Sequence, residues 1–243
     1  MVGQYYPDRI DEFDAAFECL KTDPNYRTTP VASVLTETRL KDIKRFIADL
    51  PVESLEKQEL LSFGRTVLHD QPLFNVLQQE LTSLVSELAG EALEPAYNFL
   101  SLYNNLGVCE MHMDAPNAKW TLDICIEQSA PWPIYLAEPE PWPQPKNYPP
   151  DWAQQLKQTK PFHEHVLMPN NAVLFSGSSQ WHYRNRIAQQ QKANFCHLLF
   201  LHYFPVGAGQ LLNPSKWASL FSMPELEQIK YGSSGASYTF EFS

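Results

Sequence analysis

The sequence is short of basic residues and of glycine. Its 243 residues include 18 Lys and Arg against 28 Asp and Glu, so the formal net charge is −10. Such a chain has no net positive field to attract a phosphate backbone, and we expect no nucleic-acid partner. Only 9 glycines are present beside 20 prolines, which excludes a collagen-like repeat, where glycine makes up about one-third of the residues.

Cysteines and long apolar runs are also scarce. The four cysteines, Cys19, Cys109, Cys125 and Cys196, are scattered and form no Cys-x-x-Cys pair, which is typical of reduced cysteines in a cytosolic protein. No stretch of 18 apolar residues is available to span a bilayer. The residues after Met1 lack the basic and apolar regions of a secretory signal. We therefore expect a cytoplasmic protein without a membrane partner.

The apolar residues of the first ninety positions follow a helical period. Hydrophobic residues make up 44% of the chain, enough for the core of a single domain. Apolar side chains recur at steps of three and four over 40–50, ahead of Pro51, and again between Pro72 and Gly90. Proline at the first turn and glycine after the last are typical helix boundaries. We predict two helices here, each with one face in the core.

The pattern changes after Pro95 to a period of two residues. In 119–127, for example, Trp120, Leu122, Ile124 and Ile126 alternate with more polar residues, as in a half-buried strand. Turn residues separate most of the extended segments. We predict eight strands, at 96–104, 108–113, 119–127, 133–137, 163–168, 172–176, 181–186 and 194–204. The predicted class is mainly β with N-terminal helices (α+β), in an antiparallel jelly roll.

These segments predict one domain over 1–243 with a helical cover, a β core and a C-terminal extension. The cover is 1–94, the core 95–205 and the extension 206–243. An insertion at 131–161 interrupts the core and holds nine of the 20 prolines. It also holds Trp132, Trp142 and Trp152, and such aromatic content predicts an ordered segment rather than a linker.

Three residues within the predicted strands suggest a metal site. His112 and Asp114 are two positions apart, so on an extended segment both side chains leave the same face. This pair alone also fits a turn in which Asp114 caps the following loop. A third candidate, His182, lies on the seventh predicted strand. Two histidines and one carboxylate form the facial triad of non-haem Fe(II) oxygenases, which leaves coordination positions open.

With this triad, the sequence resembles the Fe(II)/2-oxoglutarate-dependent dioxygenases, especially their prolyl-hydroxylase-like branch, over about residues 95–205. In that family the His-x-Asp follows the second strand of a double-stranded β-helix (a cupin-like jelly roll of eight core strands). The distal histidine lies on the seventh strand. The resemblance implies that these two strands are neighbours in one sheet. The segment 166–177 resembles the family's turn before the distal histidine, although Asn170-Asn171 stands where Gly-Asp is usual.

The resemblance also implies residues that hold the co-substrate. Many members carry an Arg or Lys about ten positions after the distal histidine, which is Lys192 here. Arg184 is the alternative, because it is two residues from His182 and shares its face on a regular strand. Tyr103, nine residues before His112, is a further candidate for a hydrogen bond to 2-oxoglutarate, and an ordinary buried tyrosine is the other interpretation.

The implied cofactors and co-substrates are Fe(II), 2-oxoglutarate and O2, with succinate and CO2 released. Because related halogenases replace the carboxylate with a small residue, Asp114 favours hydroxylation or another C–H oxidation over halogenation. The substrate expected is a small molecule, an amino acid or a peptide, and the sequence carries no signal for the oligomeric state. The resemblance suggests that the insertion forms a lid walled by Trp132, Trp142 and Trp152, unless these side chains only attach the loop to the barrel.

Two other functions fit the same features. One is a cupin-type metal enzyme, such as an isomerase, on the same barrel. The other is a non-catalytic jelly-roll binding protein, in which His112 and His182 have no catalytic role.

Overall fold

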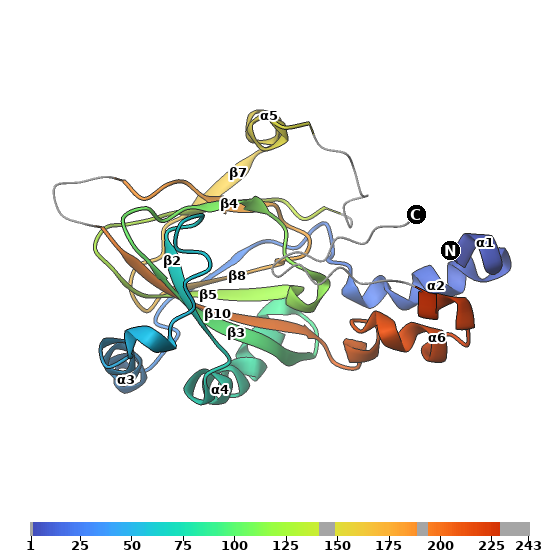
Figure 1. The fold of residues 1–243 in the computed structure, drawn as a ribbon, viewed down its shortest axis with the longest axis horizontal. Helices are drawn as coiled ribbons and strands as arrows, with labels where there is room; N and C mark the ends of the chain where they lie inside the picture. The colour runs from blue at the N-terminus through green and yellow to red at the C-terminus, as the bar shows by residue number, and fades with distance from the viewer. Residues whose placement is uncertain (1, 141–148, 189–193, 229–243) are drawn as a thin grey trace.

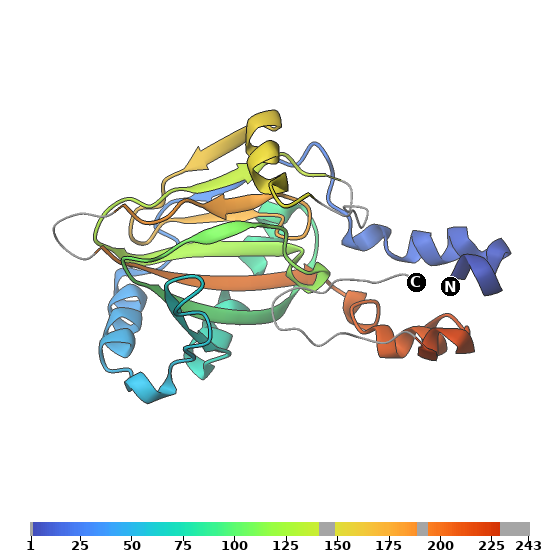
Figure 2. The same ribbon diagram turned by 45° about the horizontal axis from the view of Figure 1, so that its top comes forward.

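Two antiparallel β-sheets packed face to face form the centre of the molecule (Figure 1, Figure 2). The computed structural model describes residues 2–140, 149–188 and 194–228. The larger sheet has six strands in the order β1-β8-β5-β10-β3-β2, and the smaller has four in the order β4-β9-β6-β7. Within these residues no helix has both the length and the apolar character needed to cross a membrane.

The strands and the α-helices have the following bounds. The strands are β1 (Thr29–Val31), β2 (Arg65–His69), β3 (Leu93–Tyr103), β4 (Cys109–His112), β5 (Trp120–Gln128), β6 (Ile134–Ala137), β7 (Phe162–His165), β8 (Ala172–Phe175), β9 (His182–Arg184) and β10 (Cys196–Pro205). The α-helices are α1 (Val2–Tyr5), α2 (Ile10–Ala16), α3 (Glu37–Ala48), α4 (Pro72–Ala89), α5 (Trp152–Thr159) and α6 (Trp217–Leu220). Short 3-10 helices lie between several of these elements.

The strands from β3 to β10 are distributed over both sheets. β3, β5, β8 and β10 lie in the larger sheet, and β4, β6, β7 and β9 lie in the smaller one. This distribution resembles a jelly roll, and the mainly β class with helices is confirmed. Each of the eight predicted ranges overlaps one of these strands, with differences of up to three residues at the ends. The second and seventh of them, β4 and β9, are paired neighbours, with His112 opposite His182.

The predicted helical cover over 1–94 also contains two strands that were not predicted. β1 and β2 lie in this region, and they form the two edges of the larger sheet by pairing with β8 and β3. The described residues therefore hold ten strands. Gly64 adopts a positive φ of 65° immediately before β2, and a Cβ there would lie 2.6 Å from the backbone nitrogen of Gly107. The chain can start β2 at this point only because residue 64 lacks a side chain.

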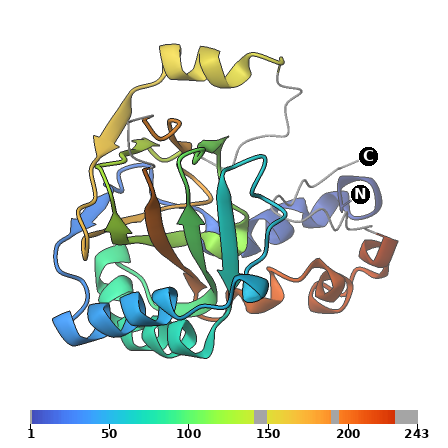
Figure 3. The same ribbon diagram turned by 60° about the vertical axis from the view of Figure 1, so that its left-hand side comes forward.

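The two predicted amphipathic helices are confirmed and cover the outer face of the larger sheet (Figure 3). α3 begins after Thr36, whose side chain accepts a hydrogen bond from the Arg39 amide at 3.2 Å. α4 starts at Pro72 and ends at Gly90, which is left-handed with a φ of 75°. Their buried side chains join those of the sheet in one core, which includes Ile43, Phe74, Leu77, Val85, Leu122, Ile124, Leu199 and Leu201.

Candidate metal centre

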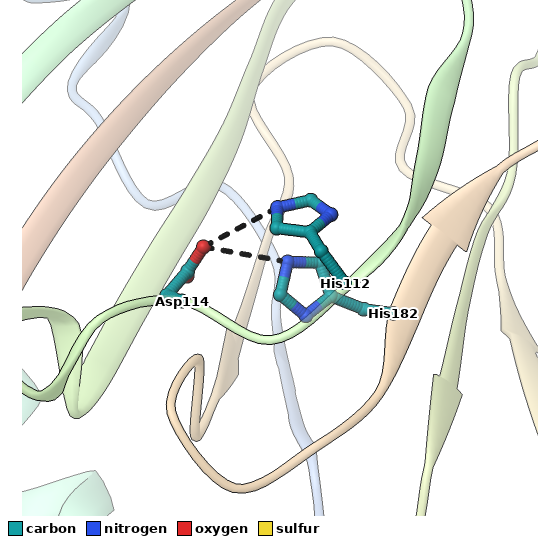
Figure 4. Close-up of side chains that lie close together, drawn as sticks. All are labelled: His112, Asp114 and His182. Atoms are coloured by element: carbon teal, nitrogen blue, oxygen red, sulfur yellow. Dashed lines mark ion pairs between the residues drawn. The ribbon is translucent and has the colours of Figure 1, made fainter. Parts of the chain in front are cut away.

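The three predicted metal ligands lie together between the sheets (Figure 4). His112 ends β4 and His182 begins β9, and the pairing of these strands brings the two rings to a centroid distance of 4.2 Å. Asp114 follows two residues after His112, and its Oδ1 lies 3.4 Å from His112 Nε2 and 3.7 Å from His182 Nε2. One ligand atom from each residue falls within 4.8 Å of the others, which a single ion can bridge.

Backbone carbonyls fix both imidazoles in the same tautomer. Nδ1 of His112 donates to the carbonyl of Glu110 at 2.7 Å, and Nδ1 of His182 donates to the carbonyl of Gln180 at 2.9 Å. Since a carbonyl only accepts, the proton of each neutral ring is on Nδ1. Each Nε2 lone pair therefore faces Asp114, which is the arrangement of a metal-binding histidine with its second nitrogen hydrogen-bonded.

The carboxylate of Asp114 is held by the loop that precedes β9 and by β5. Its backbone amide donates to the carbonyl of Gly177 at 2.8 Å. Its Oδ2 accepts a hydrogen bond from Thr121 Oγ1 at 3.1 Å, which leaves Oδ1 facing the histidines. A Cβ at Gly177 would overlap the Asp114 carboxylate, so this close approach requires glycine.

The electrostatics of the cluster suit a cation. Burial opposes the ionisation of Asp114, but the adjacent His182 and His112 hold the pKa of its carboxyl below the ordinary value. Burial lowers the pKa of His182 to about 4, so this imidazole is neutral and free to coordinate. Burial opposes the protonation of His112 too, but Cys109 and Asp114 hold the pKa of its ring above the ordinary value, so His112 has to release a proton when an ion binds. The exposed fractions of the His182, Asp114 and His112 side chains are 5%, 16% and 44%. The site is thus closed behind His182 and open to solvent beside His112.

Arg184, a predicted co-substrate anchor, forms a buried ion pair. Its Nη2 donates to Asp123 Oδ2 at 2.5 Å, and its Nη1 donates to the carbonyl of Trp132. Both members of the pair are buried, Arg184 at 2% exposure and Asp123 at 0%. Sequence reasoning did not single out Asp123, although an acidic residue between apolar neighbours on a predicted strand was an available signal.

Tyr103, the other predicted co-substrate residue within the described part of the chain, lies against an arginine that sequence reasoning missed. Its hydroxyl accepts a hydrogen bond from Arg65 Nη1 at 2.8 Å. The two residues are opposite each other in the β2–β3 pairing. Because Arg65 and Tyr103 are far apart in sequence and β2 was not predicted, no local pattern pointed to this contact.

The remaining predicted residues lie apart from the ligands or outside the described residues. Trp132 is buried, donates from its indole to the carbonyl of Asn185 at 2.6 Å and packs edge-on against Tyr103. Trp152 begins α5 and packs against Trp181, with ring centroids 5.1 Å apart. These contacts attach the insertion to the sheets. Lys192 and Trp142 are outside the described residues.

The fold is similar to that of solved oxygenase structures. The alpha-ketoglutarate-dependent carbocyclase SnoK from nogalamycin biosynthesis is similar with a TM-score of 0.56 and 12% identity, over 80% of this chain and 88% of its own. HygX from Streptomyces hygroscopicus, solved with nickel, 2-oxoglutarate and hygromycin B, is similar with a TM-score of 0.54 and 10% identity, over 74% of this chain and 83% of its own. A Pseudomonas putida prolyl-4-hydroxylase is similar with a TM-score of 0.50 and 10% identity, over 73% of this chain and 93% of its own. This chain has the fold of the iron- and 2-oxoglutarate-dependent oxygenases.

Sequence comparison adds no closer relative to these structures. No protein-family model matches the chain, and no curated protein does either. Oxygenases with this fold include a carbocyclase and a prolyl hydroxylase, so the fold alone does not define the reaction. The chemistry has to be argued from the side chains of the site.

Proposed function

We propose that the protein is an Fe(II)- and 2-oxoglutarate-dependent oxygenase in which His112, Asp114 and His182 bind the metal. The observation that carries this proposal is the common orientation of the three ligand atoms. Both Nε2 atoms and Asp114 Oδ1 face one point, and backbone carbonyls hold both Nδ1 protons away from it. Two imidazoles and one carboxylate on one side of an ion suit Fe(II) and leave its other positions open.

The chain supplies position and shielding around this centre. When bound, Fe(II) would bind 2-oxoglutarate and O2 and supply the oxidising chemistry for a C–H bond of the substrate. Thr121 fixes one oxygen of Asp114, so the other is presented to the ion. Buried His182 closes one side against water, and the more exposed His112 marks the side from which ligands enter.

A group of aromatic side chains supports a small organic substrate. Tyr97 and His202 stack with centroids 4.1 Å apart and planes at 11°, and the neighbouring Phe99 and Phe200 lie 4.8 Å apart. These rings project from β3 and β10 of the larger sheet, and His202 interacts electrostatically with Asp114. Tyr97, Phe99 and Phe200 are only half-buried. We infer that they form an apolar wall beside the metal for the substrate to be hydroxylated.

The test is binding of 2-oxoglutarate to the iron-loaded protein without oxygen. We expect a weak visible charge-transfer band when 2-oxoglutarate is added after Fe(II), and slow succinate formation on admission of air. Asp114→Ala should lose both signals while its circular dichroism spectrum stays that of the wild type. Glu87→Ala is the matched control, because it removes an exposed carboxylate on α4 at the outer face of the larger sheet.

The possible results separate this function from its alternatives. Metal binding without the band would instead favour a cupin-type metal enzyme. A protein that binds no metal would favour a binding role. To test the predicted lid, Trp132, Trp142 and Trp152 are each replaced by Leu, and a substrate found by stimulation of 2-oxoglutarate consumption is titrated. We propose that such changes raise KM more than they lower kcat.

A further inference from the structure

Arg65 is a largely buried cation on the inner face of the larger sheet. Its side chain is 17% exposed, and its Nε pairs with Glu59 in the turn before β2. Its Nη1 donates to Tyr103 Oη at 2.8 Å and to Ser101 Oγ at 3.2 Å. The guanidinium also lies 5.5 Å from the ring centre of Phe99. Arg65 is thus fixed by neighbours on β3 rather than extended into solvent.

The hydroxyls around Arg65 are left with protons to donate. Tyr103 and Ser101 are 2% and 0% exposed, and each accepts its hydrogen bond from Arg65. Among the described residues, neither hydroxyl has an acceptor for its own proton. The Nη2 group of Arg65 also has no acceptor among these residues. Buried donors without an acceptor are costly. A group of such donors around a guanidinium matches a carboxylate, which only accepts.

Arg184 and Arg65 are each paired with a carboxylate, but the two carboxylates differ in burial. Asp123 is fully buried, and its second oxygen, Oδ1, has no partner within the described part of the chain. If Arg184 turned to a ligand, Asp123 would become an unpaired buried charge, which is strongly destabilising. Glu59 is 26% exposed, so water can solvate it when Arg65 shares its donors with a ligand.

The donor group lies close to the metal ligands. Cys109, at the start of β4, interacts electrostatically with both the His112 ring and Arg65. Tyr103 also packs against Trp132, which lies under the Arg184 guanidinium. The group therefore faces the same interior as the ligands, on the larger sheet and opposite β4 and β9.

We propose that Arg65, with the hydroxyls of Tyr103 and Ser101, binds the far carboxylate of 2-oxoglutarate, while Arg184 and Asp123 are a structural pair. This assignment rests on the proposed function and names a co-substrate-binding residue outside residues 95–205, the range that resembles the oxygenase family. Arg65 comes from β2, whereas the resemblance pointed to Lys192 after the distal histidine. Nη2 of Arg65 has no acceptor among the described residues, so this nitrogen and the two hydroxyl protons can donate to one carboxylate together.

The test compares two 2-oxo acids by calorimetry on the Mn(II)-loaded full-length protein, so that no turnover is needed. 2-Oxopentanoate has the chain length of 2-oxoglutarate but a methyl group in place of the far carboxylate. We expect the wild type to bind 2-oxoglutarate about 10- to 100-fold more tightly, the range of a charge-assisted hydrogen-bonded pair. Arg65→Met should remove this preference and leave the Kd for 2-oxopentanoate unchanged.

Three controls complete the design. Arg186→Met removes an exposed arginine close to β9 and should keep the preference. Arg184→Met should also keep the preference, although we expect it to unfold more easily. If Arg65→Met fails to fold, the pair Tyr103→Phe and Ser101→Ala removes two donors and no charge, and it should weaken 2-oxoglutarate binding about tenfold.

The possible results distinguish a failure of the Arg65 assignment from a failure of the proposed function. The inference is overturned if Arg65→Met keeps the wild-type preference, or if the preference disappears in Lys192→Met and persists in Arg65→Met. It is also overturned if the folded double variant binds 2-oxoglutarate as the wild type does. Binding of neither acid by the metal-loaded wild type would instead refute the proposed function.

Discussion

Gly177 lies directly against the carboxylate of Asp114. Its carbonyl accepts the Asp114 amide at 2.8 Å, and a Cβ at position 177 would stand 2.6 Å from both Ala118 O and Thr121 Oγ1. The backbone of the loop before β9 therefore shapes the proposed metal site on the side of Asp114 away from the histidines. Gly177, which is not one of the predicted ligands, thus limits where the Asp114 carboxylate can lie.

The first prediction is that Gly177→Ala weakens metal binding. The added methyl has to displace Asp114 or Thr121, so we expect Fe(II) affinity to fall about 10- to 100-fold, as for other changes behind metal ligands. Anaerobic titration of Fe(II) measures it. Gly209→Ala is the control, because its Cβ would meet only Phe204, at 3.8 Å. Unchanged affinity in Gly177→Ala would show that the carboxylate is not a ligand in this position.

The second prediction concerns the hydroxyl that holds Asp114. Thr121→Val removes the hydrogen bond to Asp114 Oδ2 and keeps the shape of the side chain. We expect Fe(II) affinity to fall about tenfold or more, with little change in the melting temperature of the metal-loaded protein. Thr121→Ser keeps the hydroxyl and should bind Fe(II) nearly as the wild type does. Equal losses in both variants would argue for packing instead of the hydrogen bond.

The third prediction separates the Arg184–Asp123 pair from ligand binding. Arg184→Met leaves the buried Asp123 charge without a partner, so the free energy of unfolding should fall by about 3–5 kcal/mol. The double variant with Asp123→Leu removes both charges and should recover much of this loss. Urea unfolding of the metal-free protein gives the values. A single variant as stable as the wild type would show that the pair is not structural.

The fourth prediction is a pH dependence of stability due to His202. Burial lowers the pKa of His202 to about 4, whereas an exposed imidazole has a pKa of about 6.5. Between these values the unfolded chain binds more protons than the folded one. This contribution to stability is fully present above about pH 6.5 and is lost as the pH falls towards 4, by at most about 3 kcal/mol.

The variant His202→Phe tests this prediction because a phenyl ring retains the stack on Tyr97. Its free energy of unfolding should decline less than that of the wild type between pH 6.5 and pH 4, measured on metal-free protein. His163→Phe, at an exposed position on β7, is the control with the same chemical change. Parallel curves for the wild type and His202→Phe would contradict the prediction.

Local periodicity was enough to predict most of the fold and the grouping of the metal ligands. Alternation located the strands that carry His112 and His182, and the two-residue spacing placed Asp114 beside them. β1 and β2 were missed because three and five residues are too short for a clear period. Arg65 was missed with them, since its contact with Tyr103 depends on long-range pairing. The alternation placed Asp123 on the polar face of its strand, but in the structure this side chain is fully buried in the interior.

β2, which carries Arg65, is also one of the two edge strands of the larger sheet. It pairs with β3 along its whole length, from Arg65 opposite Tyr103 to His69 opposite Phe99. A fragment cut at the first strand of the jelly roll would expose the hydrogen-bonding edge of β3, which invites association with other chains. It would also lose Arg65, which lies on β2. The smallest working unit must therefore begin upstream of Glu59, well before the barrel itself.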